Sequence, residues 1–180
     1  HYTVGSLPTW CRSNLTGDPA MASEALHDAL NQQITNELGA EMQYLAMSCW
    51  FERENFQGMS NWFLKQANEE QEHAMKIVGL MNEWDLAITL KSPPNPTTDF
   101  KNAESRVEAA LAHEQKVTSQ INDIFKMARE ESAWHIEVGF QWFITEQVEE
   151  EVNARDNLSR IRMVGDNPAA LIDFDRHLSS

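Results

Sequence analysis

Apolar residues recur every three or four positions over four long stretches of the chain, the spacing of a helix with one buried face. The pattern predicts helices at about Ser23–Arg53, 59–86, 102–129 and 134–163. Ser23 has a side chain typical of a helix N-cap. A shorter amphipathic helix, Ala169–Leu178, is expected after the break at Gly165-Asp166-Asn167-Pro168. The chain is therefore expected to be all-α.

The connections between these helices predict how they are arranged. A short turn is expected at 55–58, whereas residues 87–101 contain Ser92-Pro93-Pro94-Asn95-Pro96, which cannot continue a helix. Short, long and short connections are those of a four-helix bundle with one long crossover, here followed by a short fifth helix. Residues 1–21 lack helical periodicity and contain Gly, Pro, Ser and Asn, so we expect an N-terminal extension before a single domain at 22–180.

Polar residues interrupt all four apolar stripes at positions where leucine would be expected. In the first helix the inward row reads Leu26, Leu30, Ile34, Glu37, Tyr44, Leu45 and Ser48. The interruptions in the four helices are Glu37, the pair Glu70 and His73, Glu114, and the pair Gln147 and Glu150. A lone buried carboxylate costs several kcal/mol unless it is paired or bound to a cation. Several carboxylates at one level of a bundle therefore predict a metal centre with two ions.

The residue types at these positions suit particular metals. Residues at i and i+3 share a helix face, so Glu70 and His73 can reach one ion, and oxygen with imidazole nitrogen suits iron, manganese or zinc. Tyr44 follows Glu37 by about two turns and is either a redox-active phenol or a core residue. His27, His113 and His135 do not share the inward positions, so we expect them at the surface.

A second acidic group borders these positions. It comprises Glu69, Glu72, Glu146, Glu149 and Glu151. A run of charges is usually a solvated face, and that interpretation stays open here. The alternative is an additional cation site made by Glu69, Glu146 and Glu149, which lie next to Glu70 and Glu150 in the sequence.

The composition narrows the possible partners. The 180 residues include 28 acidic and 14 basic ones, for a formal net charge of −14, which argues against nucleic acid or an anionic membrane as a partner. The charge fits the attraction of cations, although solubility alone explains an acidic surface equally well. Only Cys11 and Cys49 are present, so no disulfide framework is expected, and no apolar run reaches the roughly 20 residues of a membrane span.

The stretches that carry these residues resemble the ferritins, specifically their non-haem bacterial type, over about residues 23–178. The matching motifs are Asn36-Glu37-Leu38 with Tyr44, Glu69-Glu70-Gln71-Glu72-His73-Ala74, Glu114-Gln115-Lys116, Phe140-Gln141-Trp142-Phe143 and Glu146-Gln147-Val148-Glu149-Glu150-Glu151. The resemblance implies a ferritin-like four-helix bundle with one long crossover and a short C-terminal helix.

The resemblance also implies roles for individual residues. Glu37, Glu70 and His73 would hold one iron, with Gln147 nearby. Glu70 would bridge to a second iron held by Glu114 and Glu150. A third iron site would use Glu69, Glu146 and Glu149, with Glu150 shared. Tyr44 and Trp142 match aromatic residues beside the family's di-iron centre, where they can supply electrons.

Departures from related patterns are also informative. Bacterioferritins repeat Glu-x-x-His in the fourth helix, where this chain has Gln147 and Glu150, and they place a haem-ligating Met where this chain has Gln71. No haem is therefore expected. The two acidic positions of the three-fold channels in animal ferritins correspond to Glu137 and Phe140, which leaves the iron entry route open.

The function implied is oxidation of Fe²⁺ to Fe³⁺ by O₂ or H₂O₂ at the di-iron centre, carried by Tyr44, Glu37, Glu70, His73, Glu114 and Gln147. The ferric mineral would be stored in a homo-oligomeric shell of 24 subunits, with the bacterial cytoplasm as the expected compartment and a plastid as the alternative. Three other functions remain open: a soluble di-iron oxidase or peroxidase, a structural or metal-buffering bundle, and an encapsulin cargo protein. The last rests on residues 3–7 (TVGSL), which resemble a cargo-loading tag.

Overall fold

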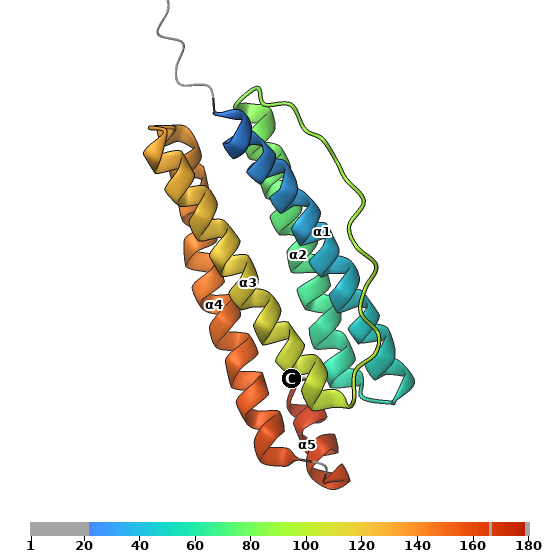
Figure 1. Cartoon of the computed structure of the whole chain (residues 1–180). Coiled ribbons are helices and arrows are strands. Elements are labelled where there is room, and N and C mark those ends of the chain that lie inside the picture. The colour runs from blue at the N-terminus through green and yellow to red at the C-terminus, as the bar shows by residue number, and fades with distance from the viewer. Residues whose placement is uncertain (1–21, 166, 179–180) are drawn as a thin grey trace, which may run out of the picture.

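The fold is an all-α bundle, seen in a computed structural model that describes residues 22–165 and 167–178 (Figure 1). Four long helices, α1 (Glu24–Arg53), α2 (Gln57–Glu83), α3 (Ala103–Glu130) and α4 (Trp134–Val164), form the bundle, and α5 (Pro168–Leu178) follows. The predicted fold class is thus confirmed. The extension expected at 1–21 lies outside the described residues. None of the described helices is both long and apolar enough to cross a membrane.

One long connection determines the order of the helices. Residues 84–102 run the length of the bundle beside α1, so that α1 and α2 form one antiparallel pair and α3 and α4 form the other (Figure 1). Side chains of α1 hold this segment in place. The Asn31 amide oxygen accepts from Thr89 N at 2.6 Å, and the Gln43 amide accepts from Thr97 N at 2.7 Å and donates to Thr97 O at 2.9 Å. The predicted crossover is confirmed.

Three of the helices end in the same way. The residue after each C-cap, Asn55, Asp85 or Ser132, has a positive φ of 55–62°, and the next residue's N–H bonds a carbonyl five residues back at 2.8–2.9 Å. This left-handed termination satisfies backbone carbonyls at a helix end, and Asn and Asp tolerate it better than most residues. It ends α2 at Glu83, three residues before the predicted end.

The core consists of two apolar clusters at different levels of the bundle. One contains Leu30, Ile77, Ile121 and Phe140, among others, and the other contains Met47, Phe63, Val107 and Ile161. In each of the four long helices, the polar residues that interrupt the apolar stripe lie between the residues of one cluster and the residues of the other. The apolar clusters therefore fix the register at which the polar side chains of the four helices meet.

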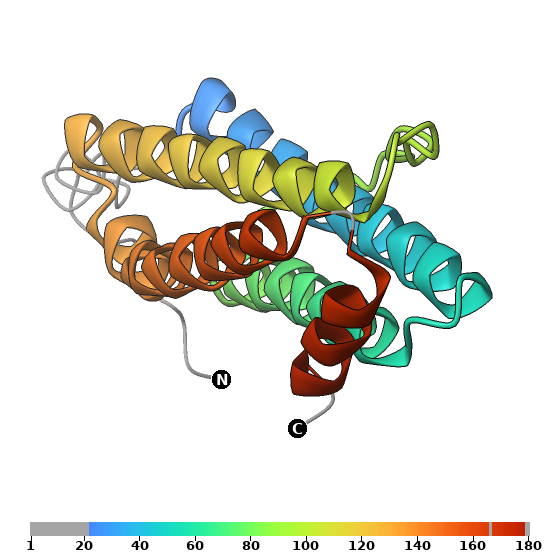
Figure 2. The ribbon, with the colours of Figure 1, turned by 90° about the horizontal axis from the view of Figure 1, so that it is seen from below.

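The structure corrects the predicted position of Leu45 and shows how the short fifth helix packs. The prediction that Leu45 faces inward was wrong, because the residue is 43% exposed. The short helix α5 lies across one end of the bundle (Figure 2). Its Phe174 is buried in the second cluster, and Asp175 Oδ1 accepts a hydrogen bond from Met59 N at 2.8 Å in the first turn of α2. The acid at this helix N-terminus is favourable for the helix dipole.

Candidate metal centre

Six polar side chains that interrupt the stripes meet in the interior of the bundle. They are Glu37 from α1, Glu70 and His73 from α2, Glu114 from α3, and Gln147 and Glu150 from α4, and none is more than 6% exposed. All six were predicted from the sequence to interrupt the inward-facing stripes. Side chains from four separate helices thus make one polar layer between two apolar clusters.

The most buried part of this layer has unsatisfied acceptors. Glu37, Glu70 and His73 each offer a ligand atom, and these atoms lie within 4.8 Å of one another. Gln33 Nε2 donates to Glu37 Oε1 at 2.8 Å, but Glu37 Oε2 and Glu70 Oε2 are buried and have no hydrogen-bond partner among the described residues. Buried acceptors are nearly always satisfied in proteins. A cation among these three residues is the partner that their geometry and charge fit.

Glu114 is held from two sides. The Tyr44 hydroxyl donates to Glu114 Oε1, and Gln147 Nε2 lies 3.4 Å from Glu114 Oε2 and 3.3 Å from the Glu114 carbonyl. Thr118 Oγ1 lies 2.9 Å from that same carbonyl and 2.7 Å from Glu151 Oε1. Glu151 is therefore engaged by α3 outside the buried layer.

A second possible metal group shares His73. Ligand atoms of His73, Glu146 and Glu150 lie within 4.8 Å of one another. His73 Nδ1 is 3.7 Å from Glu70 Oε2, whereas Nε2 is 3.9 Å from Glu146 Oε1, so the ring stands between the two groups. The structure places the remaining acids of the sequence-based third site differently. Glu69 is half-buried, bound by the Gln66 amide and by Lys65 Nζ at 3.1 Å, and Glu149 is exposed.

Burial dominates the electrostatics of the layer. It raises the pKa of Glu37 and of Glu70 well above the usual range, and the nearby Glu70 and Glu114 carboxylates, respectively, raise them further. Burial also raises the pKa of Glu114 to about 7, although the hydrogen bonds from Tyr44 and Gln147 act in the opposite direction. The pKa of Glu150 rises to about 7 through burial and the Glu114 charge. Without a cation the layer retains protons, and a bound divalent cation would displace them.

Three aromatic side chains border the layer. Tyr44 is buried, and burial followed by the Glu114 charge raises its pKa well above 10. Trp142 is 38% exposed and lies edge-on to His73 with ring centroids 5.5 Å apart, with Lys76 Nζ 4.1 Å above its indole. His113 lies edge-on to Tyr44 at 5.7 Å, and burial lowers its pKa to about 4.

The sequence analysis missed two residues next to the layer. His113 was expected at the surface, but it is half-buried, and within the described part of the chain its Nε2 has no hydrogen-bond partner. Its spacing from Ala110 and Val117, both buried, is the i, i+3, i+7 spacing of an inward stripe, so the signal was present. Gln33 was not considered, although a residue at i−4 to Glu37 is placed to donate to it.

Comparisons with known proteins identify relatives of this chain. The family model of the ferritin-like domain matches residues 27–164. Bacterial non-haem ferritins of Staphylococcus aureus and Staphylococcus haemolyticus are 29% and 30% identical over 160 residues, which is 89% of this chain and 96% of theirs. An open pore ferritin from Archaeoglobus fulgidus superposes with a TM-score of 0.86 at 33% identity, over 88% of this chain and 98% of that one.

The raised pKa of Glu114 makes a prediction for the metal-free protein. Between about 4.5, the value in the unfolded chain, and about 7, the folded chain keeps a proton that the unfolded chain has released. This stabilisation is fully present below about 4.5 and is lost as the pH rises through 7. Between pH 5 and 8, we expect the free energy of unfolding to fall by roughly 1–3 kcal/mol less in Glu114→Gln than in the wild type.

Thermal unfolding of chelator-treated protein at pH 5, 6, 7 and 8 measures this effect. Glu130→Gln is the control, because Glu130 is exposed and forms an ion pair with the exposed Lys126 at 3.8 Å. If wild type and Glu114→Gln lose stability in parallel as the pH rises, Glu114 does not carry the buried proton.

Proposed function

The chain belongs to the ferritin family of iron-storage proteins, and from that membership we propose that its buried polar layer is a ferroxidase centre. Fe²⁺ would be oxidised there to Fe³⁺ by O₂ or H₂O₂ and passed on for storage. The observation that supports this most directly is the pair of orphaned carboxylate oxygens, Glu37 Oε2 and Glu70 Oε2, beside His73. The relatives named as bacterial non-haem ferritins support the same reaction class.

We propose that Glu37, Glu70 and His73 hold the first iron. Glu70 would bridge to a second iron held by Glu114 and Glu150, with the neutral Gln147 nearby. Carboxylates are hard ligands that favour Fe³⁺ over Fe²⁺, so the site lowers the potential of the bound metal and makes oxidation favourable. Two neighbouring Fe²⁺ ions supply two electrons to one oxidant molecule. No haem position is part of this proposal.

Tyr44 has a defined place in this scheme. Its hydroxyl donates to Glu114 Oε1, which keeps that carboxylate oriented towards the layer. Since Tyr44 is buried beside the acids, loss of its proton alone is strongly disfavoured, and an electron can leave it only as the proton passes to Glu114. We therefore assign it a role in supplying an electron together with a proton. Trp142, edge-on to His73, is the second candidate donor.

Substitution of Glu70 tests the central assignment. Glu70→Ala removes the carboxylate proposed to contact both irons, so we expect the initial rate of aerobic Fe²⁺ oxidation, followed by ferric absorbance, to fall at least about tenfold. Glu72→Ala is the matched control, because Glu72 is an exposed glutamate on the same helix. Oxidation by Glu70→Ala at the wild-type rate would show that the centre lies elsewhere.

We further propose a third iron site at the edge of the layer, made by Glu69, Glu146 and Glu149 with Glu150 shared. The grouping of Glu146 and Glu150 with His73 supports it, and the exposed Glu149 would close onto an ion from the solvent side. Its place beside the centre suits an ion that supplies further electrons to the oxidant.

A stoichiometry measurement tests this third site. We expect Glu149→Ala to change the number of Fe²⁺ oxidised per O₂ consumed, measured with an oxygen electrode, while the first rapid phase keeps its rate. Glu72→Ala serves again as the control. An unchanged ratio in Glu149→Ala would remove Glu149 from the proposal.

Storage of a mineral needs a cavity that one bundle lacks, so we propose a homo-oligomeric shell of 24 subunits. Large apolar side chains on the outside of the isolated chain support assembly, namely Met163 at 78%, Val138 at 70% and Trp134 at 58% exposure. The bacterial relatives support a bacterial cytoplasm as the compartment. Residues 3–7, on which the encapsulin cargo alternative rests, lie outside the described residues.

Light scattering of the purified protein separates these assemblies. For 24 chains of 20.6 kDa we expect a particle of about 490 kDa that takes up hundreds of irons per shell. A particle below about 100 kDa would contradict the shell and favour a small open oligomer. A di-iron oxidase without storage would saturate at a few irons per chain.

A further inference from the structure

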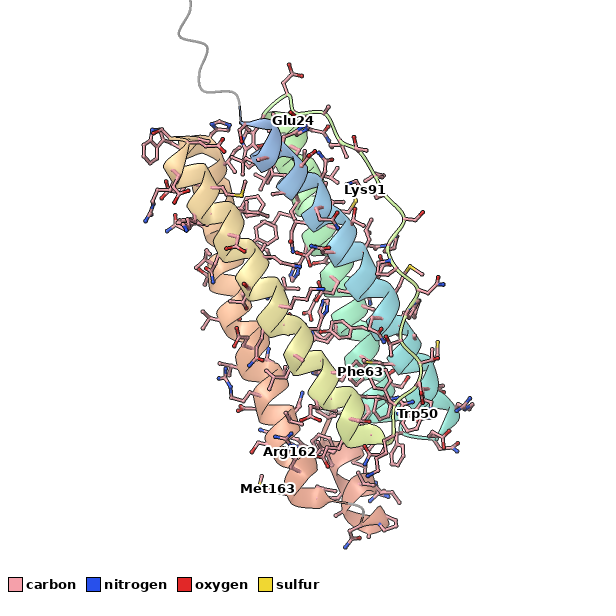
Figure 3. The ribbon with its side chains drawn as sticks, viewed as in Figure 1. Glu24, Trp50, Phe63, Lys91, Arg162 and Met163 are labelled. Carbon is pink, nitrogen blue, oxygen red and sulfur yellow. The ribbon has the colours of Figure 1, made fainter. Side chains whose placement is uncertain are left out.

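A hollow of about 610 Å³ lies outside the polar layer, where the end of α1, the end of the crossover and the first turn of α3 meet. Figure 3 labels Trp50 at this end of α1, beside the crossover. The residues that line it include Trp50, Arg53, Thr97, Thr98, Arg106 and Cys49. None of the described residues that line the hollow is acidic, in a chain with twice as many acidic as basic residues.

Arg106 is the unusual member of this group. It is only 3% exposed, and its guanidinium carbon lies 3.5 Å from the centroid of the Trp50 ring and 5.1 Å from that of Phe100. Nη1 donates to the Asn102 carbonyl at 3.0 Å. No carboxylate of the described residues forms an ion pair with this guanidinium. Buried arginines are normally paired with an acid, because stacking alone does not replace their hydration.

Charges of both signs surround Arg106, because Glu54 and Arg53 both act on its guanidinium. Arg106 lies in the first turn of α3, at the positive end of the helix dipole. Arg53 is on the same hollow, and the nearest acid, Glu54, is already engaged by Arg53 at 3.2 Å. Burial and Arg53 lower the pKa of Arg106, and Glu54 only partly offsets them. An anion in the hollow would relieve this electrostatic cost.

The shape of the site narrows the class of anion. Nη1 of Arg106 is already bonded to the Asn102 carbonyl, but the stacked guanidinium still has its Nε and Nη2 N–H groups in the ring-parallel plane, and such an edge matches two carboxylate oxygens. Met47 and Phe100 supply apolar lining, and Thr97 and Thr98 line the hollow from the crossover. The volume is within the range of small-molecule pockets. We propose that this hollow binds a small organic carboxylate, with the carboxylate on Arg106 and the apolar body against Met47 and Phe100.

This site is independent of the ferroxidase proposal, since it shares no residue with the buried layer. Calorimetric titration of the intact oligomer with sodium benzoate, at constant ionic strength, tests it. We expect saturable binding at one site per chain with a Kd below about 10 mM. Benzyl alcohol, a neutral molecule of the same shape, should bind at least tenfold more weakly. The absence of saturation, or equal binding of the alcohol, overturns the proposal.

Substitutions locate the binding. Arg106→Lys keeps the charge and the stem but loses the planar fork, so the Kd for benzoate should rise at least tenfold. Lys126→Gln removes an exposed cation elsewhere on α3 and should leave the Kd unchanged. An unaltered Kd in Arg106→Lys contradicts the assignment.

A measurement on the unaltered protein covers the case in which Arg106→Lys does not fold. The exposed thiol of Cys49 lines the same hollow, so saturating benzoate should slow its alkylation by iodoacetamide at least threefold, whereas benzyl alcohol at the same concentration should not. Peptide mapping by mass spectrometry gives the rate at Cys49 alone. Equal alkylation rates with and without benzoate would also overturn the proposal.

Discussion

The structure depends on keeping several carboxylates together in the interior of a helical bundle. The side chains of four glutamates are buried, namely Glu37, Glu70, Glu114 and Glu150. Two of their oxygens accept no hydrogen bond from any described residue. Each carboxylate would be costly alone, and their mutual repulsion adds to that cost. In the metal-free chain, retained protons reduce this cost by neutralising the carboxylates, as the raised pKa values of all four residues indicate. Cations are the more effective counter-charge at neutral pH, so metal binding and stability are linked.

The apolar clusters make this arrangement possible. Leu30 and Ile121 belong to the cluster at one level, and Met47 and Val107 belong to the cluster at the other. Both clusters use side chains of α1 and α3, so neither helix can slide without breaking contacts at two levels. The crossover adds a further constraint, because Asn31 and Gln43 bind its backbone near both of its ends. Ligand positions are therefore fixed before any metal arrives, as preorganisation of a site requires.

The sequence carried most of this information because the helical period is strict. Glu37, Glu70 and Glu114 could be recognised because each falls on a stripe whose other members are apolar, and burial on such a stripe follows from the period alone. The fourth helix was identified on the same basis. The prolines at 93, 94 and 96 were enough to predict the crossover, since no helix continues through them.

The incorrect or missing predictions concern features that the helical period does not determine. Leu45 directly follows Tyr44, at the edge of the inward stripe, and counting by threes and fours does not decide whether a residue at that edge is buried. His113 was assigned to the surface because it was not counted among the inward positions, although its spacing from Ala110 and Val117 fits an inward stripe. The early end of α2 came from the left-handed conformation of Asp85, which is a matter of local backbone energy. Hydrogen-bond partners such as Gln33 and Glu37 depend on rotamers, which spacing does not specify.

The burial of the acids changes steadily across the layer, and that gradient bears on the proposed turnover. Glu37 is fully buried, Glu150 is slightly exposed, Glu146 is half-buried and Glu149 is in solvent. His73 joins the two ends, because its Nδ1 faces Glu70 and its Nε2 faces Glu146. A site built only to retain a metal would be closed by ligands on every side. If the proposed ligands are correct, they continue towards the solvent between α2 and α4, so a ferric ion leaving the buried centre would meet further carboxylates on its way out. The neutral Gln147, where a carboxylate would hold Fe³⁺ more tightly, favours the same direction of travel.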